Sequence, residues 1–284
     1  MKNTQKNTTD TLPRDQLLVL TCTSNSKYIS PLCVFLSSLH THNQIPVVCR
    51  LVNCSDDEVK KISEFPNTTV LIDNQKLSVE RNIRNSSELL VKDYKQLRRK
   101  SDQSGFKGVG WLYSQEASYC SNIKYNTINQ LLSANNNCVV YMDVDTIIRD
   151  DVSSIYQHVI DHDAGMFICE EEKNKDSTVY GDKYMGWHAG IIIANNTSLS
   201  ERFFSVVEKR VSDDIFNMEA DEDEFDYTYK LKEFNQMKIK SINKTYKDNG
   251  PKFDSDSLVW SGQAENKESN KQYIAEYITY ETQS

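Results

Sequence analysis

The hydrophobic positions in the first part of the chain alternate between short continuous runs and helical spacings. Continuous apolar runs predict buried strands, and apolar residues three or four positions apart predict amphipathic helices. Ser55 and Glu58 have the spacing of a capping box, which satisfies two free amides at the start of a helix. The predicted elements are strands at 17–21, 47–52 and 69–72 and helices at 31–42 and 59–65. This alternation predicts a parallel sheet with right-handed crossovers.

The same two patterns continue in the second part of the chain. The predicted elements there are helices at 117–132, 152–156 and 199–211 and strands at 139–142, 165–169, 190–194 and 237–242. Residues 76–110 are charged and weakly periodic, which predicts a partly helical insertion or a mobile loop. Residues 212–226 form an acidic run, whose ordinary interpretation is a solvated surface.

No internal repeat or low-complexity linker divides the chain, so a single domain is expected. Its 284 residues and 32.8 kDa suffice for one large α/β domain with its own hydrophobic core. The polar residues 1–14 are expected to be disordered, residues 15–265 to form the domain, and residues 266–284 to form a C-terminal tail.

Charge and cysteine content limit the class of protein. The net charge of -8 and the pI of about 5.3 argue against nucleic acid as a partner, although a local basic patch stays open. The seven cysteines are odd in number and form no Cys-x-x-Cys pair, which indicates small core residues in a reducing compartment. The N-terminus is too polar for a signal peptide, and no apolar run is long enough to span a membrane. These features predict a soluble cytoplasmic protein.

The strongest candidate for chemistry is the stretch from Cys138 to Asp150. An apolar run there ends abruptly in Asp143 and Asp145. A buried strand cannot carry two bare carboxylates, so both are expected at its carboxyl end, where open α/β sheets bind ligands. Carboxylates in that place suit a hard divalent ion that also takes oxygens from a substrate diphosphate. The alternative is that the two acids begin a solvated turn or cap the next segment.

Three stretches carry a resemblance to a known family. They are residues 20–28 (Leu-Thr-Cys-Thr-Ser-Asn-Ser-Lys-Tyr), residues 138–146 around the two acids, and residues 187–192 (Trp-His-Ala-Gly-Ile-Ile). In this order they resemble the nucleotide loop, the metal motif and the Asn-Ala-Gly strand of glycogenin-like and galactinol-synthase-like, retaining family 8-like glycosyltransferases. The resemblance implies the α/β GT-A fold: a single Rossmann-like domain whose mostly parallel central sheet is flanked by helices.

The resemblance also implies a set of residues that bind the donor nucleotide. Thr23, Ser24 and Asn25 would lie in the loop after the first strand and hydrogen-bond the base and ribose. Tyr28 would stack on uracil, and Lys124 would be directed at the donor. On the residues alone, the alternatives are an ordinary turn for residues 23–25, a core position for Tyr28 and a surface position for Lys124.

Further positions are implied at the metal and at the transferred sugar. Asp143 would contact the ribose and the metal, and Asp145 the metal. His188 stands where the family has an Asn that lines the sugar, and a structural histidine is the alternative. Asp221 and Glu222 fall where the family has an Asp-Gln pair near the reacting carbon, within the acidic run that would otherwise be solvated.

The segment that supplies the family's third metal ligand is altered in this chain. Trp260 stands where that His would be. Water or a substrate oxygen would then complete the metal shell, or the metal would bind weakly. Lys267 could still reach the diphosphate.

The resemblance implies a metal-dependent transfer of a sugar from a nucleoside-diphosphate donor. The expected cofactor is Mn²⁺ or Mg²⁺, the expected donor a UDP-hexose or UDP-pentose, and the acceptor a hydroxyl of a glycan, a protein or a small molecule. Retention is implied by the resemblance; an inverting enzyme would need a carboxylate base, for which Glu116 and Glu222 are candidates. The alternatives are a module that binds a nucleotide sugar without turnover and a viral-type glycosyltransferase that acts on modified DNA.

Overall fold

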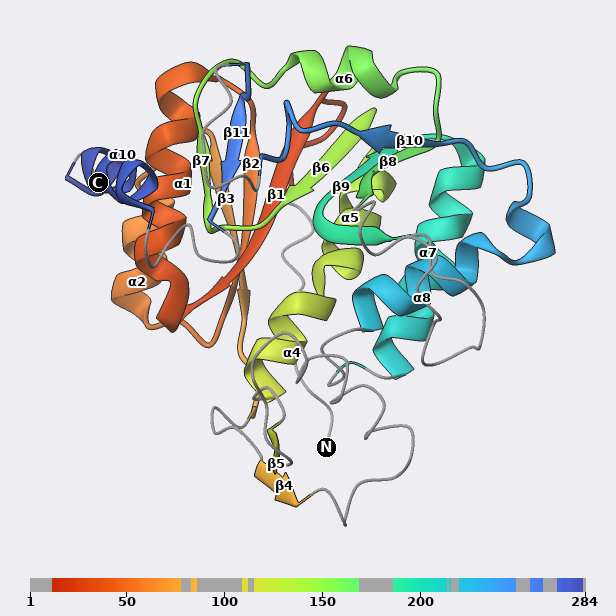
Figure 1. Ribbon diagram of the computed structural model, residues 1–284, viewed down its shortest axis with the longest axis horizontal. Helices are drawn as coiled ribbons and strands as arrows, with labels where there is room; N and C mark the ends of the chain where they lie inside the picture. Colours follow the sequence, from red (N-terminus) through yellow and green to blue (C-terminus); the bar gives the residue numbers. More distant parts are fainter. Residues whose placement is uncertain are drawn as a thin grey trace.

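The computed structural model describes residues 12–77, 83–85, 109–111, 115–168, 186–213, 215, 220–248, 256–262 and 270–282. Seven strands form one sheet in the order β10-β8-β9-β6-β1-β2-β3 (Figure 1). Their bounds are β1 Val19–Asn25, β2 Val47–Val52, β3 Thr68–Asp73, β6 Cys138–Met142, β8 Ala164–Ile168, β9 Trp187–Asn195 and β10 Ile239–Ile242. Neighbouring strands are parallel except that β9 runs antiparallel to β6 and β8. The predicted α/β class with a mostly parallel central sheet is confirmed.

Helices cover both faces of this sheet. The helices on one face are α1 (Ile29–His42), α2 (Asp56–Ser63) and α6 (Ser154–Val159). The helices on the other face are α5 (Lys124–Ser133), α7 (Ser198–Asp213) and α8 (Ala220–Tyr229) (Figure 1). Successive residues of β6 point to opposite faces: Val140 joins the core beneath α1, and Val139 joins the core beneath α5 and α7. Burial on both faces explains why this strand is a continuous apolar run.

The first half of the chain follows the predicted order. β2 occupies the predicted residues 47–52, and α1, α2 and β3 begin and end within a few residues of the prediction. The predicted capping box opens α2, because Ser55 Oγ accepts a hydrogen bond from Glu58 N, and Ser55 N donates to the Glu58 carboxylate at 2.7 Å. The predicted helix over 117–132 is two helices, α4 (Gln115–Asn122) and α5.

Helix α8 begins within the acidic run that was predicted to be a solvated surface. Asp221, Glu222 and Asp223 lie in its first turn, where the helix dipole favours negative charge. Phe225 anchors the helix, with its ring centroid 4.9 Å from that of Phe203 in an edge-to-face contact. The helix therefore carries Asp221 into the interior instead of leaving it on a solvated face.

A small second sheet follows the two candidate acids. β7 (Thr146–Ile148) pairs antiparallel with β11 (Val259–Ser261). Trp260 of β11 is fully buried, and its ring centroid lies 5.3 Å from that of Tyr273. The pairing brings a segment from late in the chain against the residues that follow β6.

Residues 271–281, within the predicted C-terminal tail, form helix α10 (Lys271–Glu281). This helix packs against α1, and Tyr277 Oη lies 3.0 Å from Ser30 Oγ near the start of α1 (Figure 1). It thereby closes one side of the region around the short 3-10 helix η2 (Ser26–Tyr28).

Some of the predicted organisation lies outside the described residues. This applies to residues 1–11 and to most of the predicted insertion 76–110, in which β4 (Ile83–Asn85) pairs antiparallel with β5 (Val109–Trp111). Leu12, predicted to be disordered, is buried, and Pro13 O accepts a hydrogen bond from Asn136 Nδ2 at 2.9 Å. No helix in the described part of the chain is both long and apolar enough to cross a membrane.

The cysteines of the described chain are free thiols, and most of them lie in the core as predicted. The buried ones are Cys22, Cys33, Cys49 and Cys138. Cys22 and Cys49 are paired in register on β1 and β2, with their sulfur atoms 3.5 Å apart. Burial raises the pKa of Cys138 to about 12, so this thiol stays protonated at neutral pH. Cys169 lies outside the described residues.

A Phe203→Ala substitution tests the packing of the helical layer that carries α8. Phe203 is fully buried on α7, and its ring contacts those of Phe204, Phe225 and Phe234. We expect a loss of about 3–5 kcal/mol in the free energy of unfolding, measured by urea denaturation. The neighbouring Arg202→Ala removes a side chain that is 63% exposed and serves as the control. A loss for Phe203→Ala no larger than that for Arg202→Ala would contradict this packing.

Candidate active site

The carboxyl ends of β1 and β6 bring the predicted donor-binding and acidic residues to one place. The two strands pair in parallel up to Thr21 and Tyr141, so the last residues of β1 lie beside the turn that carries Asp143 and Asp145. Gly190 of β9 joins this turn, because its carbonyl accepts a hydrogen bond from Asp143 N at 3.0 Å. Asp143 and Asp145 therefore stand where the sequence predicted them, at the carboxyl end of a buried strand.

Thr23, Ser24 and Asn25 differ from the prediction in their local structure. They are the last residues of β1 and not a loop, because β2 continues beside them as a parallel partner up to Val52. All three are buried. Thr23 Oγ1 and Asn25 Oδ1 find no hydrogen-bond partner among the described residues. Buried polar atoms of this kind are ordinarily satisfied, so they mark a place where a polar ligand can bind.

Glu116 of α4 connects to the same strand ends. Its two carboxylate oxygens accept hydrogen bonds from Asn25 Nδ2 at 2.8 Å and from Asn53 Nδ2 at 3.2 Å. The carboxylate thus ties α4 to the ends of β1 and β2. As a predicted candidate base it is already engaged by two amides.

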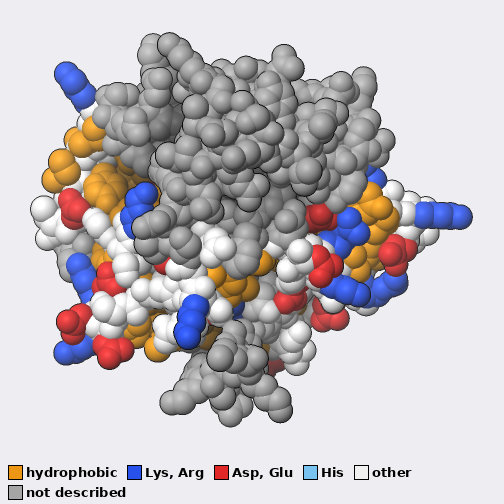
Figure 2. Space-filling view, turned by 90° about the horizontal axis from the view of Figure 1, so that it is seen from below, with side chains coloured by type: hydrophobic (Ala, Val, Ile, Leu, Met, Phe, Trp, Pro, Cys, Tyr) orange, Lys and Arg blue, Asp and Glu red, His pale blue; other side chains and the backbone are white. Residues whose placement is uncertain are grey.

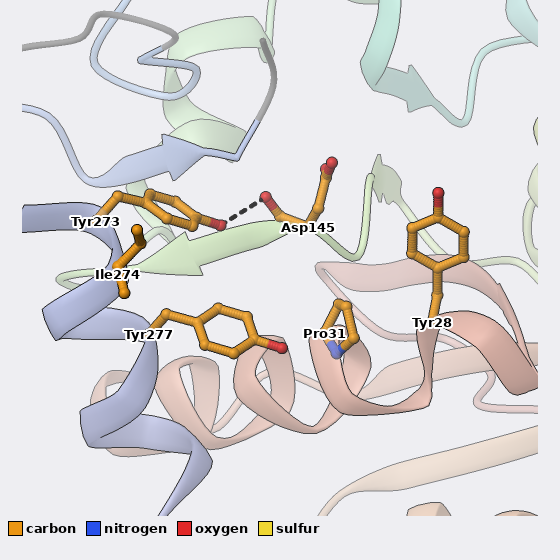
Figure 3. Close-up of a pocket in the computed structure, with 6 residues that line it drawn as sticks. All are labelled: Tyr28, Pro31, Asp145, Tyr273, Ile274 and Tyr277. Atoms are coloured by element: carbon orange, nitrogen blue, oxygen red, sulfur yellow. Dashed lines mark hydrogen bonds between the residues drawn. The ribbon is translucent and has the colours of Figure 1, made fainter. Parts of the chain in front are cut away.

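A cavity of about 260 Å³ opens beside Asp145. Tyr28 and Pro31 line it from η2 and α1, and three residues of α10 line it from the opposite side (Figure 3). These three are Tyr273, Ile274 and Tyr277. Asp145 closes the cavity from the turn before β7, and its carbonyl accepts a hydrogen bond from Tyr273 Oη at 3.0 Å (Figure 3). Tyrosines therefore make up half of the six lining residues, and Asp145 is the one acidic residue among them.

Lys124 and Asp221 form a buried ion pair behind the candidate acids. Lys124 Nζ lies 2.8 Å from Asp221 Oδ2 and 3.1 Å from Ala189 O, and 4.7 Å from the ring centroid of Tyr141. Ser121 also donates to Asp221 Oδ2, at 3.0 Å. Lys124 is 2% exposed, so it is not a surface lysine. Its ammonium is engaged within the protein on several sides.

Lys247 is a second buried lysine of the site, and no sequence pattern indicated it. Its side chain is 3% exposed, and its Nζ lies 3.1 Å from His188 Nδ1. Lys247 Nζ and Asp143 Oδ2 both lie against Gly190: a β-carbon on Gly190 would overlap Lys247 Nζ and would lie 2.6 Å from Asp143 Oδ2. Glycine at position 190 therefore lets the ammonium and the carboxylate approach the same point.

His188 and Glu222 complete this cluster. Glu222 Oε1 accepts a hydrogen bond from Ala189 N at 3.1 Å and lies 3.9 Å from His188 Nδ1. Gly190 N and the ammonium of Lys247 are both donors to His188 Nδ1, so the imidazole carries its proton on Nε2. Both side chains are half-buried, so a ligand can reach them.

The charges of the cluster shift the pKa values of its members. Burial opposes ionisation of Asp143, but the positive charges of Lys124 and Lys247 outweigh it and hold the pKa of this carboxyl below its usual value. Burial likewise opposes the charge of Lys124, yet Asp221 and Asp143 raise its pKa. Burial lowers the pKa of Lys247, which the nearby carboxylates, Asp143 first, offset only in part. The ionisation of each of these side chains therefore depends on the charges of the others.

The described residues do not form a metal site by themselves. No three His, Cys, Asp or Glu side chains in the described part of the chain are placed to hold one metal ion. Trp260, which stands where the third ligand was expected, is buried against Tyr273 and offers no metal-binding atom. Beside Asp143 lies the ammonium of Lys247. Metal binding by Asp143 and Asp145 therefore stays a prediction.

The structure brings most of the predicted site residues together and adds others. The strand ends, Tyr28, Lys124, His188, Asp221, Glu222 and the two acids surround one region. Lys267 lies outside the described residues. The residues that the sequence analysis missed are Lys247, Tyr273 and Tyr277. They belong to segments with no distinctive spacing, so only the fold places them beside Asp143 and Asp145.

Comparison with known proteins identifies the fold. No family model matches the chain, and no curated protein matches it in sequence. Its structure resembles the apo form of the glycosyltransferase GlyE of Streptococcus pneumoniae TIGR4 (TM-score 0.54, 11% identity, 95% of this chain and 63% of that chain). It also resembles the apo structure of the bifunctional glycosyltransferase WbbM, with a TM-score of 0.55 and 11% identity, over 96% of this chain and 50% of that chain. A third similar structure is galactosyltransferase LgtC in complex with donor and acceptor sugar analogs. Its TM-score is 0.53 and its identity 13%, over 92% of this chain and 95% of that chain.

These likenesses define the class of fold. The chain has the GT-A fold that its structural neighbours, which are glycosyltransferases, share. It spans 63% of the GlyE chain and half of the WbbM chain, but nearly all of LgtC. At 10–15% identity the resemblance concerns the backbone, so the site must be argued from the residues of this chain.

The Lys124–Asp221 pair yields a stability prediction. Asp221→Asn leaves the ammonium of Lys124 buried without its counter-ion, and we expect a loss of about 3–5 kcal/mol in the free energy of unfolding. The double variant Lys124→Met/Asp221→Asn should lose less than the sum of the two single variants, as measured by urea denaturation. Breaking the exposed Arg202–Glu233 pair with Glu233→Gln should cost no more than about 1 kcal/mol. Additive losses at Lys124 and Asp221 would show that the two side chains do not depend on each other.

Proposed function

We propose that the protein is a glycosyltransferase that takes its sugar from a nucleoside-diphosphate donor, with a UDP-sugar as the expected donor. The observation that carries this proposal is the meeting of Asp143 and Asp145 with an aromatic cavity and unsatisfied polar atoms at the carboxyl ends of β1 and β6. The glycosyltransferases among the structural neighbours support it through their shared fold. A nucleoside and a diphosphate together need such a combination of aromatic, polar and charged groups.

The parts of the donor match different parts of the site. The aromatic cavity between Tyr28 and Tyr277 suits the base, and Thr23 and Asn25 offer free polar atoms nearby. Asp143 is the predicted partner of the ribose. The diphosphate would lie beyond Asp145, toward the cluster of Lys247, His188 and Glu222. His188, Asp221 and Glu222 are the residues that the family resemblance assigns to the transferred sugar, and this assignment stays part of the proposal.

The proposed reaction moves the sugar to a hydroxyl of a glycan, a protein or a small molecule. The bond between the anomeric carbon and the diphosphate oxygen breaks, and its electron pair leaves with the diphosphate. The acceptor oxygen forms the new bond and releases its proton, which the departing diphosphate can accept. This route retains the anomeric configuration and requires no dedicated carboxylate base; it fits the engagement of Glu116 by two amides.

The predicted Mn²⁺ or Mg²⁺ would be held by Asp143 and Asp145 together with waters and donor oxygens. In that place the ion supplies positive charge to the leaving diphosphate. The incomplete set of ligands among the described residues also favours a second candidate: a module that binds nucleotide sugar without turnover. The two candidates differ in whether nucleoside diphosphate is released.

The described residues on one face of the molecule give no support to a nucleic-acid substrate (Figure 2). On the face shown in Figure 2, the described acidic and basic side chains are interspersed. The net charge is -8. A protein that tracks a phosphate backbone needs clustered positive charge, so small-molecule, glycan and protein acceptors are preferred.

A donor panel tests the proposed function. UDP- and GDP-sugars are incubated with the protein and either Mn²⁺ or EDTA, and released nucleoside diphosphate is measured. We expect slow release from one donor, and a loss of about 100-fold or more in Asp145→Asn, because Asp145 lines the cavity beside the proposed diphosphate position. The control Asp161→Asn changes an exposed Asp and should release product like the wild type.

Two results would count against different parts of this proposal. Release in Asp145→Asn at the wild-type rate, with the variant still folded by circular dichroism, would contradict the role of the acids. Tight binding of UDP without release from any donor would favour the module without turnover.

The cavity itself is tested by Tyr277→Ala. Tyr277 lines the cavity, whereas Tyr280 lies on the same helix outside it, and each hydroxyl contacts a residue of α1, Ser30 and His42 respectively. If the base packs on Tyr277, removal of the tyrosine ring should weaken UDP binding by about 1–3 kcal/mol in isothermal titration calorimetry. Tyr280→Ala is the matched control and should bind UDP like the wild type. Equal affinities for both variants would place the base elsewhere.

A further inference from the structure

Positive charge is needed where a nucleoside diphosphate leaves, and the interior of this site contains two candidates for it among the described residues. Lys124 Nζ already contacts Asp221 Oδ2, Ala189 O and the Tyr141 ring. Lys247 Nζ has one hydrogen bond, to His188 Nδ1, among the described residues. An ammonium carries three donors. Lys247 therefore keeps donors that a ligand can use, and Lys124 does not.

The fold holds Lys247 at this place through its backbone. Asp248 N donates to Val259 O at 2.9 Å, and Ser261 N donates to Asp248 O at 2.8 Å, so the residue after Lys247 is fastened to β11. On the other side, Tyr246 is buried with its ring centroid 5.7 Å from that of His158. The lysine is thus fixed between two anchored neighbours and is not a flexible surface side chain.

The residues around Lys247 explain why the described part of the site does not fit a divalent metal ion. Its Nζ and Asp143 Oδ2 both flank the α-carbon of Gly190, which leaves room for them only because it has no side chain. Asp145 and Glu222 add negative charge at longer range. An ammonium beside Asp143 repels a second cation, and Trp260 supplies no ligand to compensate for that repulsion.

We propose that Lys247 is the resident cation of this site and that its ammonium contacts the diphosphate of the donor in place of a divalent metal ion. This inference rests on the proposed function and replaces the predicted metal. As the bond from the anomeric carbon to the diphosphate oxygen breaks, negative charge grows on that diphosphate. Lys247 donates hydrogen bonds to its oxygens and keeps its own proton, so the proton of the acceptor hydroxyl still leaves with the diphosphate.

The inference is tested by UDP binding, which does not depend on turnover. Isothermal titration calorimetry with the wild type should give the same dissociation constant in EDTA and in Mn²⁺, within about twofold. Lys247→Met should weaken binding in EDTA by about tenfold to a hundredfold, because a charge-assisted hydrogen bond is lost. Lys247→Arg keeps the charge and should recover much of the affinity. Lys244→Met removes an exposed lysine from the same turn and should bind like the wild type.

A further variant tests whether a metal ion can take the place of the Lys247 ammonium. Lys247→Asn removes the ammonium and adds an oxygen that can ligate a metal, so Mn²⁺ should strengthen its UDP binding although it does not do so for the wild type. If Lys247→Met fails to fold by circular dichroism, the wild-type comparison of EDTA with Mn²⁺ still decides the question.

The outcomes separate the two proposals. Wild-type binding that requires Mn²⁺, or Lys247→Met binding as tightly as the wild type in EDTA, would overturn the role of Lys247 and leave the glycosyltransferase proposal intact. Absence of UDP and GDP binding in both conditions would overturn both.

Discussion

Buried carboxylates need buried cations, and this constraint shapes the region around the carboxyl end of β6. Asp143 follows directly on a strand that is covered on both faces, and Asp221 is carried inward by α8. Each has a lysine near it that is almost fully buried, Lys247 beside Asp143 and Lys124 bonded to Asp221. Removing any one of these charges would reduce the compensation of the buried charges around it. The elements that carry them come from distant parts of the chain, so the charges are brought together only by the complete fold.

The same constraint gives the site its chemical character. A carboxylate held near an ammonium is a place where a ligand of mixed charge can bind, since phosphate oxygens meet the lysine and hydroxyls meet the acid. The aromatic cavity on the other side of Asp145 adds a surface for a flat ring (Figure 3). Helix α10 forms half of that cavity, so the end of the chain belongs to the site as much as the strand ends do.

Local patterns in the sequence predicted much of the fold and the position of the acids. Burial on both faces produces the uninterrupted apolar run of β6, and the abrupt change at Asp143 marks the end of that strand. The extension of β1 to Asn25 could not be seen, because its last residues are polar and become strand only through pairing with β2. Helix α8 was missed because a run of acidic residues hides the Phe225 that docks it. Lys247 resembles any other lysine of a polar turn until β11 fixes the turn beside Gly190.

A crystal structure of the protein with UDP, grown in EDTA, tests the central claim most directly. We expect the base in the cavity against Tyr28 and Tyr277, and a diphosphate oxygen within hydrogen-bond distance of Lys247 Nζ. We expect no metal ion between Asp143 and Asp145. A diphosphate bound away from Lys247, or bound only when crystals contain Mn²⁺ coordinated by the two acids with Lys247 displaced, would contradict it.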